Sequence, residues 1–284
     1  MSTSVRQARR PAAAPSRRAA AGFVVPAWAV AVVGLLAALV ITAVTLLTVR
    51  HSDPEPQAQA AAPPPTAVIA EIDGQKIPLR ELALYLAQDR AVTFAHFQQA
   101  YGATDGPHFW TTPHGGQTPS DYLKKRALTD VTRATVVLEL AHRHQLIADP
   151  GYDAFLTGWT TENARRRQAV AAHQIIYGPV QYTEANYFTY VLHDLDARLE
   201  QVLTQAGTIP APDSALRAYY RSHLDAFRQQ DATTRKITTP RFGEVVQQVR
   251  QGYVHSRYQT LTTGLARTAR VSIEKTVLAA VPVD

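Results

Sequence analysis

The run of residues from Phe23 to Val49 constrains this 284-residue chain more than any other feature, because it contains no charged side chain. A helix rises about 1.5 Å per residue, so about 20 apolar residues cross the hydrocarbon core of a bilayer. Cleavable signal peptides have an apolar run of only about 7–15 residues. The sequence therefore predicts a transmembrane helix over residues 23–49. Cleavage at the small-residue tract 57–62 remains an alternative.

Basic residues are concentrated before this run. Six of the 29 Lys and Arg residues precede residue 51, where no acid occurs, and the other 23 balance the 23 Asp and Glu residues of the chain. The positive-inside rule then predicts a single-pass cell-membrane protein with a cytoplasmic N-terminus and an extracytoplasmic C-terminal domain. No nucleic-acid partner is expected, because phosphate binding needs basic residues clustered on the folded part.

Composition divides the chain into four parts. Residues 1–22 are rich in Ala, Arg, Pro and Ser and predict a disordered cytoplasmic tail, which precedes the membrane helix at 23–49. Residues 50–66 contain five prolines and predict an extended linker. The remaining residues, 67–284, are numerous enough for one large domain or two small ones.

Apolar spacing in residues 67–284 predicts a mainly α fold with a small β element. Val68, Ala70 and Ile72 alternate before Asp73-Gly74, a dipeptide that favours a hairpin turn. Steps of three and four residues predict amphipathic helices at 79–101, 121–147, 152–172, 183–206, 214–227 and 242–265. Ser120 is expected to cap the second of these helices, and the closing segment, with Val271 and Ile273, is expected to be a strand.

Motifs for catalysis or metal binding do not occur in this sequence. The chain has no Cys and no nucleophile elbow, phosphate-binding loop or HExxH pair, so we expect no catalytic residue, metal or cofactor. His142 and His144 lie two positions apart on a predicted helix and cannot bind one ion together. His193 is expected to form a solvated ion pair with Asp196.

Aromatic residues are the main candidates for a binding site. A groove wall of aromatic side chains could hold extended peptides, since aromatics give large contact areas that tolerate many sequences. The alternative is ordinary helix packing. The candidate peptide-binding residues are Tyr177, Tyr182, Tyr187, Phe188, Tyr190, Tyr219 and Tyr220. The nearby run Arg165, Arg166 and Arg167 predicts a solvated helix face or salt bridges to Glu162.

Two segments resemble a known family. The segment VIAEIDGQKIPLREL, with Val68, Gly74 and Glu81, is similar to the opening strand, turn and helix of SurA/PrsA-type foldases. The segment PDSALRAYYRSHLDAF is similar to the helix that precedes the parvulin isomerase domain in that family, and the sequence after residue 241 resembles the elements that follow it. The resemblance implies a helical, SurA- or trigger-factor-like chaperone domain.

The resemblance is incomplete where the isomerase domain should lie. Only residues 228–241 separate Phe227 from Phe242, which is too short for a parvulin domain of about a hundred residues. The family's catalytic residues therefore cannot be carried over to this chain. The resemblance implies a membrane-anchored chaperone that binds unfolded, extended or secreted polypeptides without an isomerase module.

Three alternatives remain open at the level of sequence. The chain could be a foldase with residual peptidyl-prolyl isomerase activity or an envelope hydrolase with an unrecognised site. It could also be a scaffold or accessory subunit that binds one fixed partner. A receptor for small molecules is the third alternative, which the absence of a lipobox cysteine disfavours. The sequence predicts neither the clients nor the oligomeric state.

Overall fold

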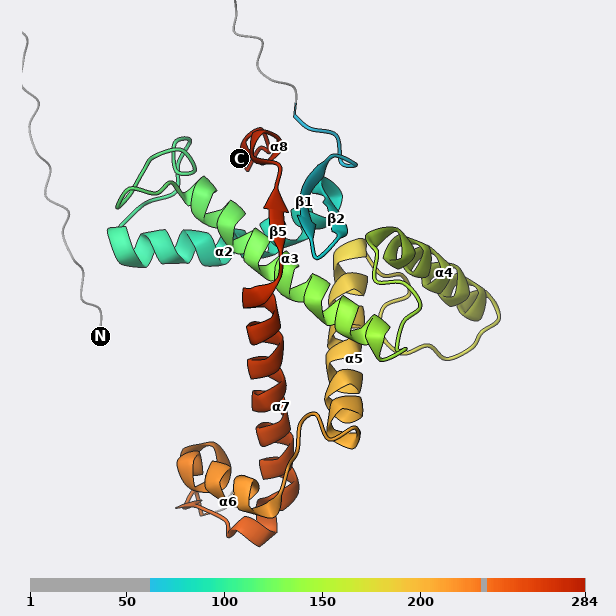
Figure 1. The fold of residues 1–284 in the computed structure, drawn as a ribbon, viewed down its shortest axis with the longest axis vertical. Helices are drawn as coiled ribbons and strands as arrows, with labels where there is room; N and C mark the ends of the chain where they lie inside the picture. Colours follow the sequence, from blue (N-terminus) through green and yellow to red (C-terminus); the bar gives the residue numbers. More distant parts are fainter. Residues whose placement is uncertain (1–61, 231–233, 284) are drawn as a thin grey trace, which may run out of the picture. The chain divides into compact units, whose positions relative to one another are not determined.

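The computed structural model describes residues 62–230 and 234–283, which lie in the unit Ala60–Asp284 (Figure 1). The tail at 1–22, the membrane helix at 23–49 and most of the linker at 50–66 lie outside the described residues. Within the described ranges, no helix combines the length and the apolar character that crossing a membrane requires. The membrane helix at 23–49 therefore stays a prediction.

A small antiparallel sheet begins the described part. Strands β1 (Val68–Ile72) and β2 (Gln75–Pro78) form the predicted hairpin around Asp73-Gly74, where both residues have positive φ. Asp and Gly tolerate this left-handed conformation, which explains the turn. Strand β5 (Val271–Ile273) pairs antiparallel with β1, giving the order β2-β1-β5. The strand predicted at the end of the chain is thus confirmed.

Helices make up most of the described residues, as predicted. The α-helices are α2 (Leu79–Tyr101), α3 (Pro119–Arg143), α4 (Tyr152–Ala171), α5 (Glu184–Gln205), α6 (Asp213–Ser222), α7 (Phe242–Thr268) and α8 (Lys275–Ala279). A 3₁₀ turn, η1 (Leu224–Phe227), follows α6 and replaces the end of the helix predicted over 214–227. The short helix α8 was not predicted.

Helix α3 is the central element, since α2, α5 and α7 all pack against it (Figure 1). Its buried residues Leu123, Ala127 and Val131 recur every four positions and join the hairpin and α2 in one core. Farther along the helix, Val137 and Leu140 enter a second core with residues of α5 and α7. One helix therefore connects both apolar clusters.

The end of α7 near its first residue carries a third, smaller core. Leu216 of α6 and Phe227 of η1 pack there against Val245 and Val249 of α7. Between η1 and α7, strands β3 (Gln229–Gln230) and β4 (Ile237–Thr238) form a two-stranded hairpin. The described residues of the 228–241 segment therefore include this short hairpin.

The beginning of α3 corrects one prediction. Thr118, and not Ser120, is the N-cap, because its side-chain oxygen accepts a hydrogen bond from the backbone N–H of Asp121 at 3.0 Å. Pro119 then occupies the first helical position, where a missing N–H has no cost. The helix also ends earlier than predicted, at Arg143, with Gln145 in a left-handed conformation just beyond it.

Candidate functional site

The seven candidate aromatic residues do not form one groove. The structure places them in three separate surroundings: a stacked cluster with its adjoining loop, the first core, and the third core. We use the name tyrosine surface for the half-buried Tyr182 and Tyr187 and the exposed Tyr190, together with the exposed α4–α5 loop residues Ile175, Tyr177 and Val180.

Three tyrosine rings form the centre of the tyrosine surface. The ring of Tyr182 lies 5.6 Å from Tyr187 and 5.6 Å from Tyr190, and the latter two rings are 6.2 Å apart. Tyr187 and Tyr190 are three positions apart on α5, so helical geometry brings them to one face. Tyr190 is 52% exposed. The cluster therefore exposes aromatic surface to solvent, and contacts among the three rings fix its position.

Polar groups on α4 fix the backbone of Tyr182. Asn163 accepts a hydrogen bond from the Tyr182 N–H at 2.8 Å and donates one to its carbonyl oxygen at 3.0 Å. The indole N–H of Trp159 donates to the same carbonyl at 2.9 Å. Because three hydrogen bonds hold this one residue, the start of the cluster is positioned before any ligand binds.

Arg166 fixes the rest of the loop. Its buried guanidinium donates to the carbonyl oxygens of Tyr177 at 3.0 Å and Pro179 at 2.6 Å, and it lies 4.4 Å from the centre of the Tyr182 ring. Glu162 accepts a hydrogen bond from the same side chain at 2.8 Å and balances its charge. The expected salt bridges to Glu162 are confirmed for Arg165 and Arg166.

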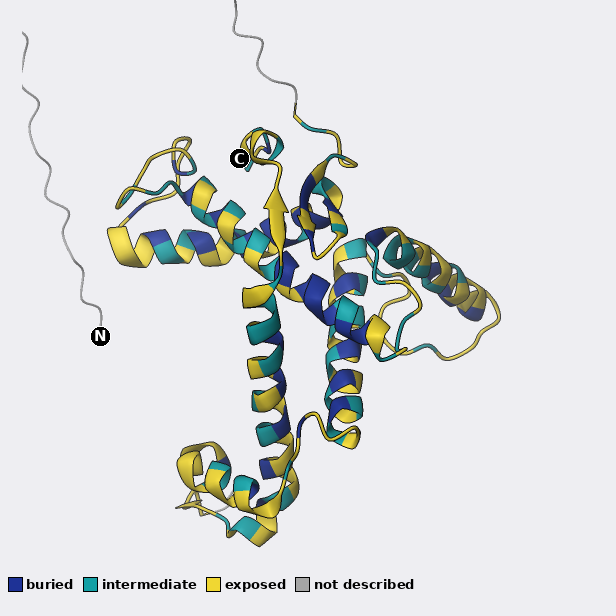
Figure 2. Cartoon of the chain, viewed as in Figure 1, coloured by how far each residue is buried: buried dark blue, intermediate teal, exposed yellow. Residues whose placement is uncertain are grey.

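Apolar residues of the loop point into solvent although the loop backbone is held. Ile175 is 85% exposed and Tyr177 is 87% exposed, and Val180 is also exposed. Figure 2 shows the connection from α4 to α5 mostly in the colour of exposed residues. Patches of exposed apolar residues are typical of a surface that binds another polypeptide, and this loop presents three such residues within six positions. Sequence analysis missed Ile175 and Val180, although apolar residues beside Gly178-Pro179 were a signal.

Phe188 does not belong to this surface. It is 5% exposed and its ring packs edge-to-face against Tyr85 and Phe155 in the first core. Phe188 follows Tyr187 directly on α5, so its side chain points about 100° away around the helix. For Phe188, helix packing explains the aromatic residue.

Tyr219 and Tyr220 lie in the third core. The Tyr219 ring stacks on the His223 ring at 4.0 Å and also contacts Tyr253 of α7. The hydroxyl of Tyr220 donates to the carbonyl oxygen of Pro240, and its ring packs against Phe242. Both rings therefore connect α6 to α7 and are separate from the tyrosine surface.

A charged cluster joins the first turns of α2, α4 and α5. Arg80 donates to Glu184 at 2.6 Å, and the Tyr152 hydroxyl donates to the same carboxylate. Burial alone would raise the pKa of Glu184, but the bonds from Arg80 and Tyr152 outweigh it and lower that pKa. The cluster links the start of α5 to two other helices.

Glu81 is the most perturbed acid in the described part of the chain. Its side chain is buried at the start of α2, and desolvation raises its pKa to about 8. It forms no salt bridge among the described residues. Isolated from counter-charges, a carboxyl group in such surroundings is protonated at neutral pH.

A polar cavity of about 400 Å³ lies between α2, α3 and α5. Arg126 donates to Asp89 at 2.8 Å beside it. The pKa of Asp130, which also lines the cavity, is raised by burial and by the neighbouring charge of Asp89. The hydroxyl of Tyr85 and the second carboxylate oxygen of Asp89 have no hydrogen-bond partner in the described structure.

Histidines do not form a metal site in the described residues. No group of three or more His, Asp or Glu side chains there could hold an ion. The Nδ1 of His142 faces the carbonyl of Ile147, and His144 caps the end of α3. The ion pair expected between His193 and Asp196 is wrong, because Asp196 accepts a hydrogen bond from the Tyr258 hydroxyl at 2.5 Å instead.

One curated protein is similar to part of this chain. It comes from Bifidobacterium longum subsp. longum and is described as a chaperone for lacto-N-biosidase; the two are 22% identical over 144 residues. The match covers 51% of this chain and 51% of that protein, so the chain spans about half the length of the curated relative it matches. No family model matches the chain. No solved structure matches it.

The similarity to a chaperone agrees with the general class that the SurA/PrsA-type resemblance implies. The finer assignment to SurA/PrsA-type foldases has no family match to support it. The chain is therefore similar to a chaperone. Its clients, its anchoring and its lack of an isomerase module are proposed below.

Proposed function

We propose that the chain is a membrane-anchored, extracytoplasmic chaperone that holds unfolded or extended polypeptide segments on the tyrosine surface. The observation that carries the proposal is the exposure of Ile175 and Tyr177, in a loop whose Tyr177 and Pro179 carbonyl oxygens are bound by buried Arg166, and of Tyr190 on α5. Tyrosine supplies contact area at low conformational cost, so such a surface binds varied sequences by apolar contact. Similarity to a chaperone supports the same class.

Aggregation of a chemically unfolded enzyme tests this proposal. The full chain in detergent should suppress light scattering near a 1:1 ratio, whereas albumin should not. Replacing Ile175, Tyr177 and Tyr190 together by Ala should weaken the suppression several-fold. The control is Tyr101→Ala, which removes from the end of α2 an aromatic ring about as exposed as Tyr190, at 48% against 52%. Equal suppression by both variants would overturn the tyrosine surface as the binding site.

A chaperone dedicated to one client is the second candidate. The relative's description names a single enzyme, and this observation favours one partner over many. Crosslinking through residue 177 in the native membrane separates the two candidates. A dedicated chaperone gives one major adduct, and a general chaperone gives a broad distribution.

We propose that neither candidate includes proline isomerisation. The described part of residues 228–241 contains the β3–β4 hairpin between η1 and α7. A protease-free prolyl-peptide assay of the full chain should therefore show only the uncatalysed rate, beside a parvulin enzyme as positive control.

A further inference from the structure

Strand β5 has a free edge. It is the outer strand in the order β2-β1-β5, and within the described residues no other strand pairs with it. The bonds from the Asp73 N–H to the Arg270 carbonyl and from the Glu274 N–H to the Ile69 carbonyl set the register. In antiparallel pairing, alternate residues face the partner strand. Val271 and Ile273 therefore turn their N–H and C=O groups away from β1.

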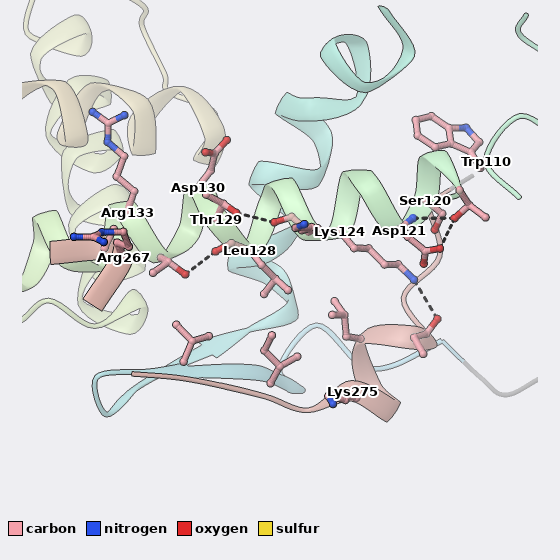
Figure 3. Close-up of a pocket in the computed structure, with 18 of the residues that line it drawn as sticks. Trp110, Ser120, Asp121, Lys124, Leu128, Thr129, Asp130, Arg133, Arg267 and Lys275 are labelled. Carbon is pink, nitrogen blue, oxygen red and sulfur yellow. Dashed lines mark hydrogen bonds between the residues drawn. The ribbon is translucent and has the colours of Figure 1, made fainter. Parts of the chain in front are cut away.

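An apolar groove runs beside this edge. Figure 3 shows it between α3, strand β5 and helix α8, and its volume is about 1190 Å³. The apolar side chains that line it include Trp110, Leu128, Ala266, Val271, Ile273 and Leu278. The edge strand and an apolar wall therefore face the same space, which is the arrangement that accepts an added strand in other proteins.

The rim of the groove is cationic. Its basic residues are Lys124, Lys125, Arg133, Arg267 and Lys275, against two acids, Asp121 and Asp130. Asp121 accepts a hydrogen bond from the Thr118 hydroxyl at 2.7 Å. Burial raises the pKa of Asp130, which disfavours its charged form. Among the described residues, Lys125, Arg267 and Lys275 form no salt bridge with an acid.

Lys124 closes one end of the groove. Its Nζ donates to the carbonyl oxygen of Ala279 at 3.1 Å, and burial lowers its pKa. Figure 3 shows this bond crossing from α3 to the C-terminal segment. The other end of the groove, with Arg133 and Arg267, is exposed.

We infer that the free edge of β5 binds an extended, acidic segment of a client polypeptide as a fourth strand. The inference rests on the proposed chaperone function and adds a second contact surface to it. The backbone of Val271 and Ile273 supplies hydrogen bonds that do not depend on client sequence. Lys125, Arg267 and Lys275 supply the preference for acidic side chains.

Two other occupants fit the groove less well. A second copy of this chain would place one cationic rim against another, which is unfavourable. The chain's own linker has acids at Asp53 and Glu55, but these alternate with Pro54 and Pro56. Proline has no N–H, so this segment cannot complete the hydrogen bonds of an added strand.

Peptide binding by the full chain in detergent tests the inference. The probe is a fluorescent nine-residue peptide in which Val and Ile alternate with Glu and Asp. A second peptide has Lys at every acidic position, and a third has N-methyl groups on alternate backbone nitrogens. We expect the acidic peptide to bind at least about tenfold more tightly than the other two at low salt. Equal binding of all three would overturn the inference.

Variants of the chain locate the binding site. Val271→Pro with Ile273→Pro removes two outward N–H groups while the pairing with β1 keeps its own donors. Lys125→Glu with Arg267→Glu reverses the rim charge without changing the backbone, and should reverse the preference between acidic and basic peptides. The control is Lys76→Glu with Lys236→Glu, two exposed positions outside the groove. Unchanged preference in the Lys125/Arg267 variant would contradict the inference.

The aggregation assay separates this inference from the proposed function. Suppression that persists together with unselective peptide binding would overturn the β5 edge and leave the chaperone proposal intact. Selective binding at the edge without any suppression would overturn the chaperone proposal and support the edge as an acidic-segment site.

Discussion

Arg166 shows how one buried charge can organise an exposed loop. Its guanidinium reaches two carbonyl oxygens of the α4–α5 loop, the Glu162 carboxylate and the Tyr182 ring. Removing it would leave those acceptors without their donor in a partly buried place, which costs about 1–3 kcal/mol. The buried Arg166 side chain thus fixes the backbone of loop residues whose own side chains, such as Tyr177, stay exposed.

The first prediction concerns this arginine. Arg166→Met should increase hydrogen exchange and protease cleavage across residues 172–182 and lower the free energy of unfolding by about 1–3 kcal/mol. Arg165→Met removes a neighbouring, solvent-exposed partner of Glu162 and should leave both readouts almost unchanged. Comparable loop exchange in the two variants would contradict the role given to Arg166.

The second prediction concerns Glu81. Its pKa in the folded chain is about 8, above the ordinary value of 4.5, so the folded state binds more protons than the unfolded state between these pH values. Stability from this residue is therefore present at acidic pH and is lost as the pH rises through 8. Between pH 5 and 9 the loss is at most about 4 kcal/mol, from 1.36 kcal/mol per pH unit.

Urea unfolding of Glu81→Gln at several pH values measures this effect. The variant should become progressively more stable than the natural chain as the pH rises from 5 to 9. Glu71→Gln, at an exposed position of β1, is the control and should show no such trend. A constant stability difference for Glu81→Gln would show that the carboxyl titrates normally.

At the scale of elements, local sequence patterns predicted helix positions but not which distant segments pair. The helix over 79–101 was predicted correctly because Gly102, at φ +66°, ends it with a left-handed residue. The cap of α3 was misplaced by two positions because Thr118 and Ser120 are equally good caps by sequence. Only the chain's path from the preceding loop distinguishes them.

The arrangement of the candidate site was predictable only where its residues lie within one segment. Tyr187 and Tyr190 are three positions apart on α5 and share a helix face, a proximity that their spacing indicates. Tyr219 lies in another core because of the packing of α6 on α7, which no local pattern shows. The pairing of β5 with β1 joins residues about 200 positions apart, and sequence alternation cannot indicate a partner at that separation.

The third prediction tests the observed cap. Thr118→Ala should lower the free energy of unfolding by about 1 kcal/mol, because the first turn of α3 then has an N–H without its acceptor. Ser120→Ala changes a residue already inside the helix and should have a smaller effect. Urea unfolding of the two variants side by side measures both, and a larger loss from Ser120→Ala would contradict the assignment.

At the scale of the whole molecule, the fourth prediction concerns the span at residues 23–49. The full chain should stay with membranes after alkaline carbonate extraction, and a variant lacking residues 23–49 should be released. Protease added to the outside of unlysed spheroplasts should cleave within residues 67–284. Cleavage only after lysis would contradict the proposed orientation.

Because β5 pairs with β1, the three-stranded sheet can form only after residues 270–274 have been synthesised. Residues 69–73 are synthesised about 200 residues before their outer partner, 270–274. Until that partner arrives, β1 keeps an unpaired edge, which is prone to associate with other chains. Premature termination anywhere before residue 270 would therefore leave a chain whose β1 edge stays unpaired and prone to aggregation.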